Sequence, residues 1–136
     1  MKELASRLKR GDDLKDSIEE ICQNIDTAIV LSAVGCIKGM RIRLAKAESY
    51  LADDRDYEII SLTGTIIQGK CHLHIGLSDE KGNCIGGHLE KGCIVNTTCE
   101  LVLGILEEIT AERIFDENTG YREAVFHRKK EVDAYD

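Results

Sequence analysis

The sequence contains no proline and no tryptophan, and aromatic residues account for only 4% of its 136 positions. It also lacks a Ser/Gly-rich stretch that could act as a linker, and it has no internal repeat. A chain of this length is the size of one ordinary domain and can bury a core without covalent staples. We therefore expect a single domain that occupies nearly the whole chain.

Long apolar runs are absent as well. A membrane-spanning helix needs roughly 20 consecutive apolar residues, and no segment approaches that length. The first residues, Met1 to Leu4, do not begin a signal peptide. With 43% hydrophobic and 32% charged residues, the composition is that of a globular chain. We expect a soluble, cytoplasmic protein.

Positive charge is in deficit. The 18 Lys and Arg residues stand against 25 Asp and Glu, so the net charge is -7. Binding to DNA by charge alone depends on an excess of cations, so contact with DNA would need a local basic patch or a partner. Arg41 and Arg43 provide two guanidiniums on one face of a strand, with Lys38 and Lys46 nearby. We interpret them as a solvated or subunit-contacting face in preference to an anion site.

No Cys-x-x-Cys pair occurs, which removes the usual signature of structural zinc sites and of thioredoxin-like redox pairs. Most of the cysteines lie in apolar runs, where cysteine behaves as a small hydrophobic residue. We expect reduced thiols. The six cysteines are Cys22, Cys36, Cys71, Cys84, Cys93 and Cys99.

The clearest helix is predicted over residues 13–25, where apolar side chains recur at helical spacing and charged ones face outward. Asp12 or Asp13 is a suitable N-cap, because a side-chain carboxylate can accept from the free N–H groups of the first turn. Residues 4–10, which precede Gly11, receive no assignment.

Most of the remaining chain is predicted to be strand, because β-branched and aliphatic runs alternate with glycine-containing turns. Turn residues at 69–70, 79–83 and 116–120 favour antiparallel neighbours. The fold class is therefore α+β, with one mainly antiparallel sheet and at least one helix on a face. The charged residues 129–136 are expected to fray. The predicted strands are 28–36, 40–45, 57–67, 71–77, 84–89, 93–103, 109–115 and 121–127.

Residues 64–70 match the first seven positions of a phosphate-binding P-loop. Position 71 is cysteine, however, where such loops carry a hydroxyl for Mg²⁺. A P-loop also opens a helix, whereas this segment continues into a predicted strand. We interpret the match as coincidence, and Gly64 and Gly69 as strand ends.

Three of the four histidines fall close together, at His72, His74 and His88. His72 and His74 lie on one face of a strand because side chains alternate across it. If Asp79 pairs with Asn83 in a three-residue loop, His74 lies opposite His88 on that face. A four-residue loop would turn His88 away, and a bulge at the preceding Gly-Gly pair could redirect it.

Three imidazoles on one face would suit Zn²⁺, with Ni²⁺, Fe²⁺ or Cu²⁺ as alternatives. Asp79, Glu90 and Glu100 could orient an imidazole or complete the coordination. An open coordination position could activate water for hydrolysis or hydration. The simpler interpretation is that His72 and His74 pair with carboxylates on a polar face and that His88 is a turn residue.

The order of several motifs resembles the plant and prokaryote conserved (PPC) domain, and the likeness covers roughly residues 3 to 128. This range is the expected domain, followed by the tail 129–136. The motifs are Arg7-Leu8-Lys9-Arg10-Gly11-Asp12-Asp13-Leu14, Ser61-Leu62-Thr63-Gly64-Thr65-Ile66, His72-Leu73-His74-Ile75-Gly76-Leu77-Ser78-Asp79, Gly82, Gly86-Gly87-His88-Leu89, Gly92-Cys93-Ile94-Val95-Asn96-Thr97-Thr98-Cys99-Glu100 and Thr119-Gly120-Tyr121.

The resemblance implies a homotrimer in which the histidines matching His72, His74 and His88 gather around a metal in prokaryotic members. Plant members carry an AT-hook, a proline-containing basic element that enters the DNA minor groove, and a chain without proline has none. Prokaryotic members are nevertheless often labelled as DNA-binding. The strands at 61–67 and 93–103 are expected in the core or at an interface. A trimeric zinc-binding module is the leading hypothesis; a DNA-associated regulator and a metal-dependent hydrolase or hydratase are the alternatives.

Overall fold

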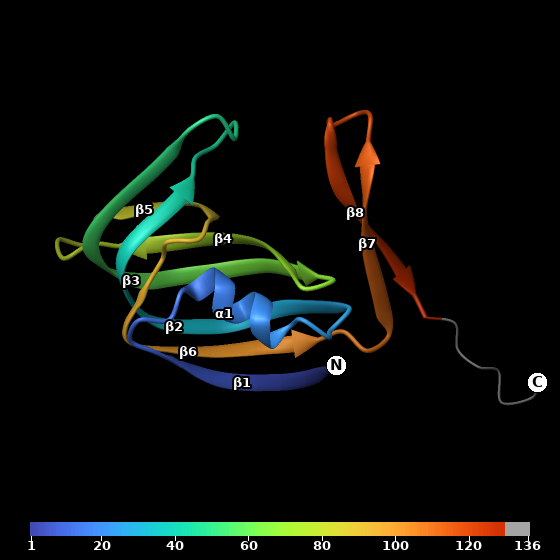
Figure 1. Cartoon of the computed structure of the whole chain (residues 1–136), viewed down its shortest axis with the longest axis horizontal. Helices are drawn as coiled ribbons and strands as arrows, with labels where there is room; N and C mark the ends of the chain where they lie inside the picture. Colours follow the sequence, from blue (N-terminus) through green and yellow to red (C-terminus); the bar gives the residue numbers. More distant parts are fainter. Residues whose placement is uncertain (130–136) are drawn as a thin grey trace, which may run out of the picture.

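The computed structural model of the protein describes residues 1–129 and shows an antiparallel β-sheet with one short helix on a face (Figure 1). The helix is α1 (Leu14–Ile21). The strands are β1 (Lys2–Lys9), β2 (Thr27–Arg43), β3 (Tyr50–Ile67), β4 (Lys70–Ser78), β5 (Cys84–Leu89), β6 (Val95–Ile105), β7 (Ile109–Asp116) and β8 (Tyr121–Arg128). The α+β prediction is confirmed.

Six strands form the main sheet in the order β1-β6-β2-β3-β4-β5. The sheet curls, because the end of β2 also pairs with β5: Ile42 lies opposite Leu89 and Arg43 opposite His88. The strands from β2 to β5 consequently close into a ring, and β5 is held from both sides. This closure brings the chain around His88 next to both β4 and β2.

Strands β2 and β3 form a long hairpin that the sequence patterns divided or shortened. The predicted strands 28–36 and 40–45 are one strand, with a register shift between Lys38 and Met40. Gly39 lies at that shift with φ +86°, a backbone conformation that glycine adopts without strain. Strand β3 begins at Tyr50 rather than at 57, because pairing with β2 extends it through charged residues that no hydrophobic pattern marks.

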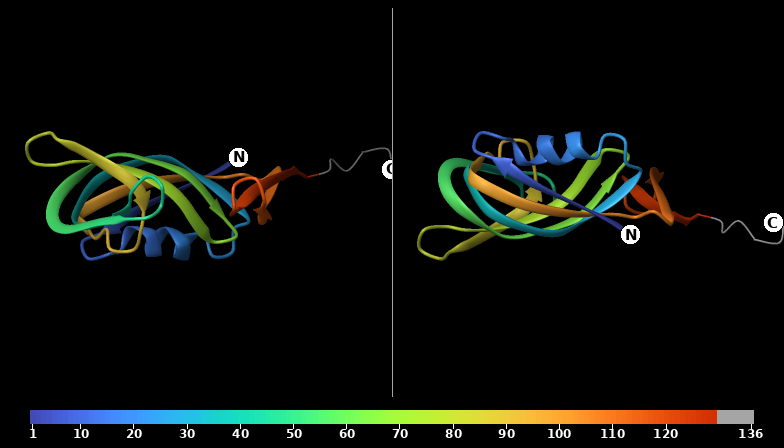
Figure 2. Two further views of the ribbon diagram at one scale, coloured as in Figure 1. Left: turned by 90° about the horizontal axis from the view of Figure 1, so that it is seen from above. Right: turned by 90° about the horizontal axis from the view of Figure 1, so that it is seen from below.

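Helix α1 packs on one face of the sheet (Figure 2), with Leu14 and Ile18 fully buried. Asp13 is the N-cap, as one of the two predicted residues, and its carboxylate accepts from the Asp16 N–H at 2.9 Å. The predicted end at residue 25 is wrong. The helix ends at Ile21, and the backbone N–H of Ile25 donates to the Cys22 carbonyl in a following turn at 2.9 Å.

The core lies between the helix and the concave face of the sheet. As expected, the strands at 61–67 and 93–103 contribute to it, for example through Leu62, Ile66 and Leu101. Strand β1, which the sequence left unassigned, pairs along β6 at the edge of the sheet from Lys2 opposite Ile105 to Lys9 opposite Thr98. Only Leu8 of this strand is buried, so its hydrophobic signal is weak.

Strands β7 and β8 form the predicted final hairpin, which stands apart from the main sheet in Figure 1. Its base is fixed at Ala111: the backbone N–H donates to the Asp26 carboxylate at 2.9 Å, and the carbonyl accepts from the Gln68 amide at 3.3 Å. Within residues 1–129, no helix is long and apolar enough to cross a membrane. The expected fraying tail lies, beyond Lys129, outside the described residues.

Candidate metal centre

Strand β4 separates its side chains cleanly between two faces. Leu73, Ile75 and Leu77 are buried in the core, and this alternation places His72 and His74 on the opposite, open face. The start of the strand is fixed from the helix, because the backbone N–H of Cys71 donates to the Glu19 carboxylate at 2.8 Å. The two histidines therefore project from a strand anchored next to them.

The register between β4 and β5 brings the third histidine to the same face. The backbone N–H of Asp79 donates to the Asn83 carbonyl at 2.9 Å, which closes the three-residue loop. His74 then lies directly opposite His88. The predicted pairing is confirmed, and the four-residue alternative is wrong.

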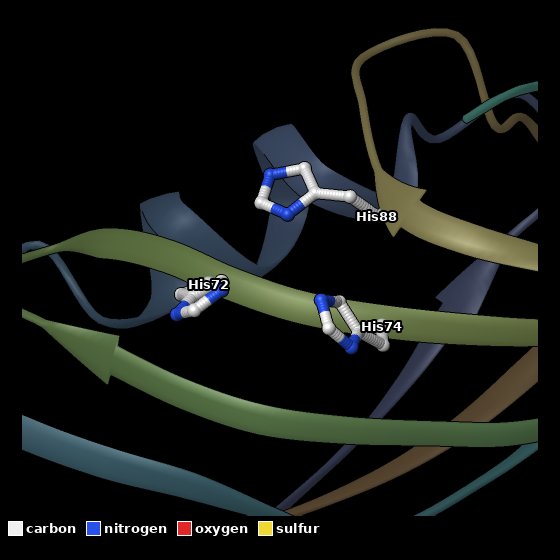
Figure 3. A group of neighbouring side chains, drawn as sticks. All are labelled: His72, His74 and His88. Atoms are coloured by element: carbon white, nitrogen blue, oxygen red, sulfur yellow. The ribbon is translucent and has the colours of Figure 1, made fainter. Parts of the chain in front are cut away.

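The three imidazoles form a nearly equilateral triangle (Figure 3). Their ring centroids are 5.5 Å apart for His72 and His74, 5.5 Å for His72 and His88, and 5.9 Å for His74 and His88. One nitrogen from each ring lies within 4.8 Å of the others. The ligand atoms of a tetrahedral zinc ion stand about 3.3 Å apart. Small rotations of the exposed His72 and His74 side chains would therefore bring the three nitrogens within bonding distance of one ion.

Carboxylates near the triangle are fewer than the sequence suggested. Glu90 lies 4.0 Å from His88 Nε2, which is longer than a hydrogen bond. Asp79 instead accepts from Lys81, Asn83 and Arg55 at the β4–β5 turn, and exposed Glu100 lies on β6 opposite Arg7. Glu90 alone of these three acids contacts a histidine, so the interpretation of His72 and His74 as partners of carboxylates gains no support from them.

Burial and neighbouring cations keep two of the imidazoles neutral. Burial is the largest cause that lowers the pKa of His88 to about 4, and Arg43 and the other two histidines add to it. Burial followed by Arg113 likewise lowers the pKa of His72. A neutral imidazole is the form that binds a metal ion, so both residues are ready to act as ligands near neutral pH.

The lowered pKa of His88 predicts a pH-dependent stability of the metal-free protein. In the unfolded chain this imidazole takes up a proton near pH 6.5, whereas in the folded protein it does so near pH 4. The contribution of the neutral His88 imidazole to the unfolding free energy is therefore fully present above pH 6.5 and is lost as the pH falls toward 4. We expect a loss of about 1 kcal/mol after solvent screening.

Urea unfolding of metal-free wild type and of a His88→Gln variant across this range would measure that contribution. The wild type should lose more unfolding free energy than the variant, because all other titrating groups are shared. Parallel pH profiles would contradict the prediction.

One atom of the triangle tests whether a metal ion fits. Among the described residues, His88 Nδ1 is the buried side-chain nitrogen or oxygen that has no hydrogen-bond partner. Such an atom costs about 1–3 kcal/mol when left unpaired. A metal bond would satisfy it, and an all-imidazole donor set is one that zinc and neighbouring transition metals accept. The residues fit the group.

The chain matches the family model of the plants and prokaryotes conserved (PCC) domain over residues 1–107. The chain belongs to this family. It is the plant and prokaryote conserved (PPC) family that the sequence motifs resemble, so that prediction is confirmed. The β7–β8 hairpin lies beyond the matched range, so the family pattern ends where the main sheet ends.

Two known proteins show extensive similarity to this chain. The bifunctional protein GlmU of Synechococcus sp. (strain JA-3-3Ab) is 39% identical over 131 residues, which cover 94% of this chain and 21% of that protein. The chain thus spans about a fifth of the length of the curated relatives it matches. A hypothetical protein from Salmonella superposes with a TM-score of 0.91 at 30% identity, covering 95% of each chain.

Two further solved structures carry functional descriptions. The metal-containing protein AF0104 from Archaeoglobus fulgidus has a TM-score of 0.72 at 30% identity and covers 92% of this chain and 94% of its own. A protein from Bacteroides thetaiotaomicron, proposed to bind DNA, has a TM-score of 0.80 at 20% identity and covers 93% of each chain. At that identity the second likeness shows the fold alone.

Sequence patterns did not place any arginine beside the histidines of the site, where the structure places Arg43 and Arg113. Arg113 Nη2 lies 3.5 Å from His72 Nδ1 and 3.5 Å from Thr65 Oγ1. It comes from the β7–β8 hairpin, 41 residues further along the chain, and hydrophobic periodicity says nothing about contacts at that separation. Arg43 reaches the site through the β2–β5 pairing. Arg43 was noted in the sequence only as part of a basic face.

The predictions made for the P-loop match at residues 64–70 have mixed outcomes. Gly69 does end a strand, in the β3–β4 turn, but Gly64 lies inside β3 opposite Leu73, so its assignment as a strand end is wrong. The segment after the P-loop match is strand, as predicted.

All six cysteines, which fall within residues 1–129, are free thiols. Burial raises the pKa of Cys71 to about 12 and those of Cys93 and Cys99 to about 11.

Proposed function

We propose that this PCC-domain protein is a metal-binding module in which His72, His74 and His88 hold one transition-metal ion, with Zn²⁺ as the first expectation. The observation that carries the proposal is the triangle of imidazoles within 4.8 Å, one of which has a buried nitrogen without a partner. The description of the Archaeoglobus relative as metal-containing supports it. Ni²⁺, Fe²⁺ and Cu²⁺ remain alternatives for the same donor set.

Elemental analysis of protein purified without chelators tests this function. We expect about one transition-metal ion per chain, because three imidazoles offer a complete set of protein ligands. A chain that contains no metal after growth in zinc-supplemented medium, and that binds none on titration, would contradict the proposal.

The proposed unit is a homotrimer whose domain extends over residues 3–128, including the β7–β8 hairpin. Exposed apolar side chains support self-association, since Leu31 is 44% exposed, Val34 55% and Ile60 58% on neighbouring strands of the main sheet. The hairpin exposes Ile114 and Phe115 in addition. Soluble monomers seldom leave such side chains grouped in the open.

Light scattering should therefore give a mass of about 45 kDa, three times the 15.1 kDa of the chain. An Ile60→Lys variant should dissociate, because a buried interface does not accept an unpaired ammonium. Ala52→Lys, at another exposed position of β3, is the matched control and should remain associated. A monomeric wild type would remove this part of the proposal.

DNA association is the second candidate, and the structure gives the predicted Arg41 and Arg43 face a different form. The Arg41 guanidinium lies over the Tyr50 ring, 4.7 Å from its centroid, whereas Arg43 lines a pocket with Lys46. This local positive charge, on an acidic chain, favours the candidate. Duplex binding that weakens steeply with salt would support it, and no affinity at low salt would remove the direct form.

A metal-dependent hydrolase or hydratase is the third candidate. Glu123 lines the pocket that contains the histidines and is the carboxylate placed there that could act as a base. Turnover of an ester, phosphoester or amide by metal-loaded protein, lost in a Glu123→Gln variant, would support this function.

A further inference from the structure

A pocket of about 870 Å³ lies over the three histidines. Strands β4 and β5 carry the histidines on one side of it. Arg43 at the end of β2 and residues 44–47 of the β2–β3 turn contribute to the pocket, and the β7–β8 hairpin contributes Arg113 and residues 121–123. Pockets of 300–1,000 Å³ are typical of small-molecule sites. The imidazole triangle is thus part of a cavity with room for more than a metal ion and a water molecule.

The charge of this pocket is opposite to that of the chain. Four cations line it, namely Arg43, Lys46, Arg113 and Arg122, against one carboxylate, that of Glu123. Within the described residues 1–129, none of the four cations forms an ion pair with a carboxylate. The whole chain carries a net charge of -7, so the excess of cations in this pocket is a local feature and not a consequence of a generally basic protein.

Two of the guanidiniums are held by the fold beside the imidazoles. Arg43 lies opposite His88 in the β2–β5 pairing. Arg113 lies 3.5 Å from His72 Nδ1, and Arg122 donates to the Arg113 carbonyl at 2.9 Å, which ties the neighbouring strand to it. The cations that line the pocket repel one another, so an anion bound between them would be stabilised.

We propose that this pocket binds the phosphate group of a small phosphate monoester, held by Arg43 and Arg113 beside the metal ion. The proposal rests on the proposed function only for the share of the affinity that the metal supplies. A guanidinium group can donate two parallel N–H···O hydrogen bonds to two oxygens of one phosphate group. A dianion balances several unpaired cations better than a singly charged carboxylate does, and the hydroxyls of Ser61 and Thr63 in the lining can donate to further oxygens.

We expect the bound phosphate group to belong to a small molecule rather than to a nucleic acid. The four cations line one open pocket of the size of a small-molecule site. A DNA backbone presents singly charged phosphodiesters along a rod, and its binding depends on many dispersed contacts. The two sources share the phosphate group, so the experiment compares them directly.

Isothermal titration calorimetry with inorganic phosphate and glycerol 3-phosphate would test the proposal on metal-free and zinc-loaded protein. We expect both anions to bind in both forms, more tightly with zinc. Arg43→Gln and Arg113→Gln should each weaken binding by at least about tenfold. Arg55→Gln is the matched control, since the Arg55 guanidinium pairs with Asp79 at 3.4 Å outside the pocket. The phosphate affinity of this variant should equal that of wild type. Metal content is measured on every sample.

Several outcomes would overturn the proposal: no phosphate binding in either form, equal affinity in the arginine variants and wild type, acetate binding as tightly as phosphate, or a DNA duplex binding more tightly than glycerol 3-phosphate. If the wild type contains no metal but metal-free protein still binds phosphate through Arg43 and Arg113, the metal function fails and this site stands. If zinc binds but phosphate does not, the reverse holds.

Discussion

Replacement of His74 by alanine is expected to remove the metal ion, lowering affinity by more than about 100-fold. Even residues that only support metal ligands cost 10–100-fold when changed, and a lost ligand leaves two imidazoles that cannot complete a tetrahedral site. His74 lies directly opposite His88, and its ring centroid is 5.5 Å from that of His72, so the substitution removes one corner of the triangle. Elemental analysis and zinc titration would measure the loss.

The fourth histidine supplies a matched control. His127 lies on the exposed hairpin, where its Nε2 is 3.3 Å from Glu112, and a His127→Ala variant should keep its metal. Because the His74 side chain is exposed, the metal-free His74→Ala protein should unfold within about 0.5 kcal/mol of metal-free wild type. Retained metal in His74→Ala, or an equal loss in His127→Ala, would show that the triangle is not the binding site.

A Gly64→Ala substitution should destabilise the fold by about 3 kcal/mol or more. The added Cβ would lie 2.1 Å from the His72 carbonyl oxygen and 3.0 Å from Leu73 Cα, both of which belong to the backbone of β4 and cannot rotate away. The backbone at Gly64 also has φ +139°, which other residues rarely adopt. The β3–β4 pairing must therefore shift, and the histidines with it, so unfolding free energy and metal affinity should fall together.

Gly82→Ala separates the two causes. Gly82 also has a positive φ, +82°, but an added Cβ meets nothing within 4 Å. This variant should lose only about 1 kcal/mol, the cost of the backbone conformation alone. Urea unfolding of both proteins would compare them, and equal losses would mean that the close approach of β3 to β4 does not determine stability here.

The histidine triangle shows how far local pattern reaches. Alternation along a strand placed His72 and His74 on one face, and the turn residues between Asp79 and Asn83 limited the register to few choices. Both features act over a few residues, so the sequence carries them directly. The choice among turn lengths needed the structure, since loops of three and four residues have similar composition.

The second set of residues at the site depended on contacts that no local pattern encodes. Arg113 reaches His72 because Ala111, two residues earlier, is fixed by the Asp26 carboxylate. Arg43 reaches His88 because the sheet closes between β2 and β5. Propensity and periodicity report neighbours in sequence, whereas these pairings form between elements that meet only after the sheet has curled.

By itself, the sequence determined an α+β chain with antiparallel strands, an N-cap at Asp12 or Asp13, and His72 and His74 on one strand face, because backbone geometry and side-chain alternation are local properties. Tertiary structure alone decided that β2 and β3 are long continuous strands, that β1 forms an edge, and that a positively charged pocket covers the histidines. Those features result from closure of the sheet and docking of the β7–β8 hairpin, where burial and pairing between distant segments outweigh local preference.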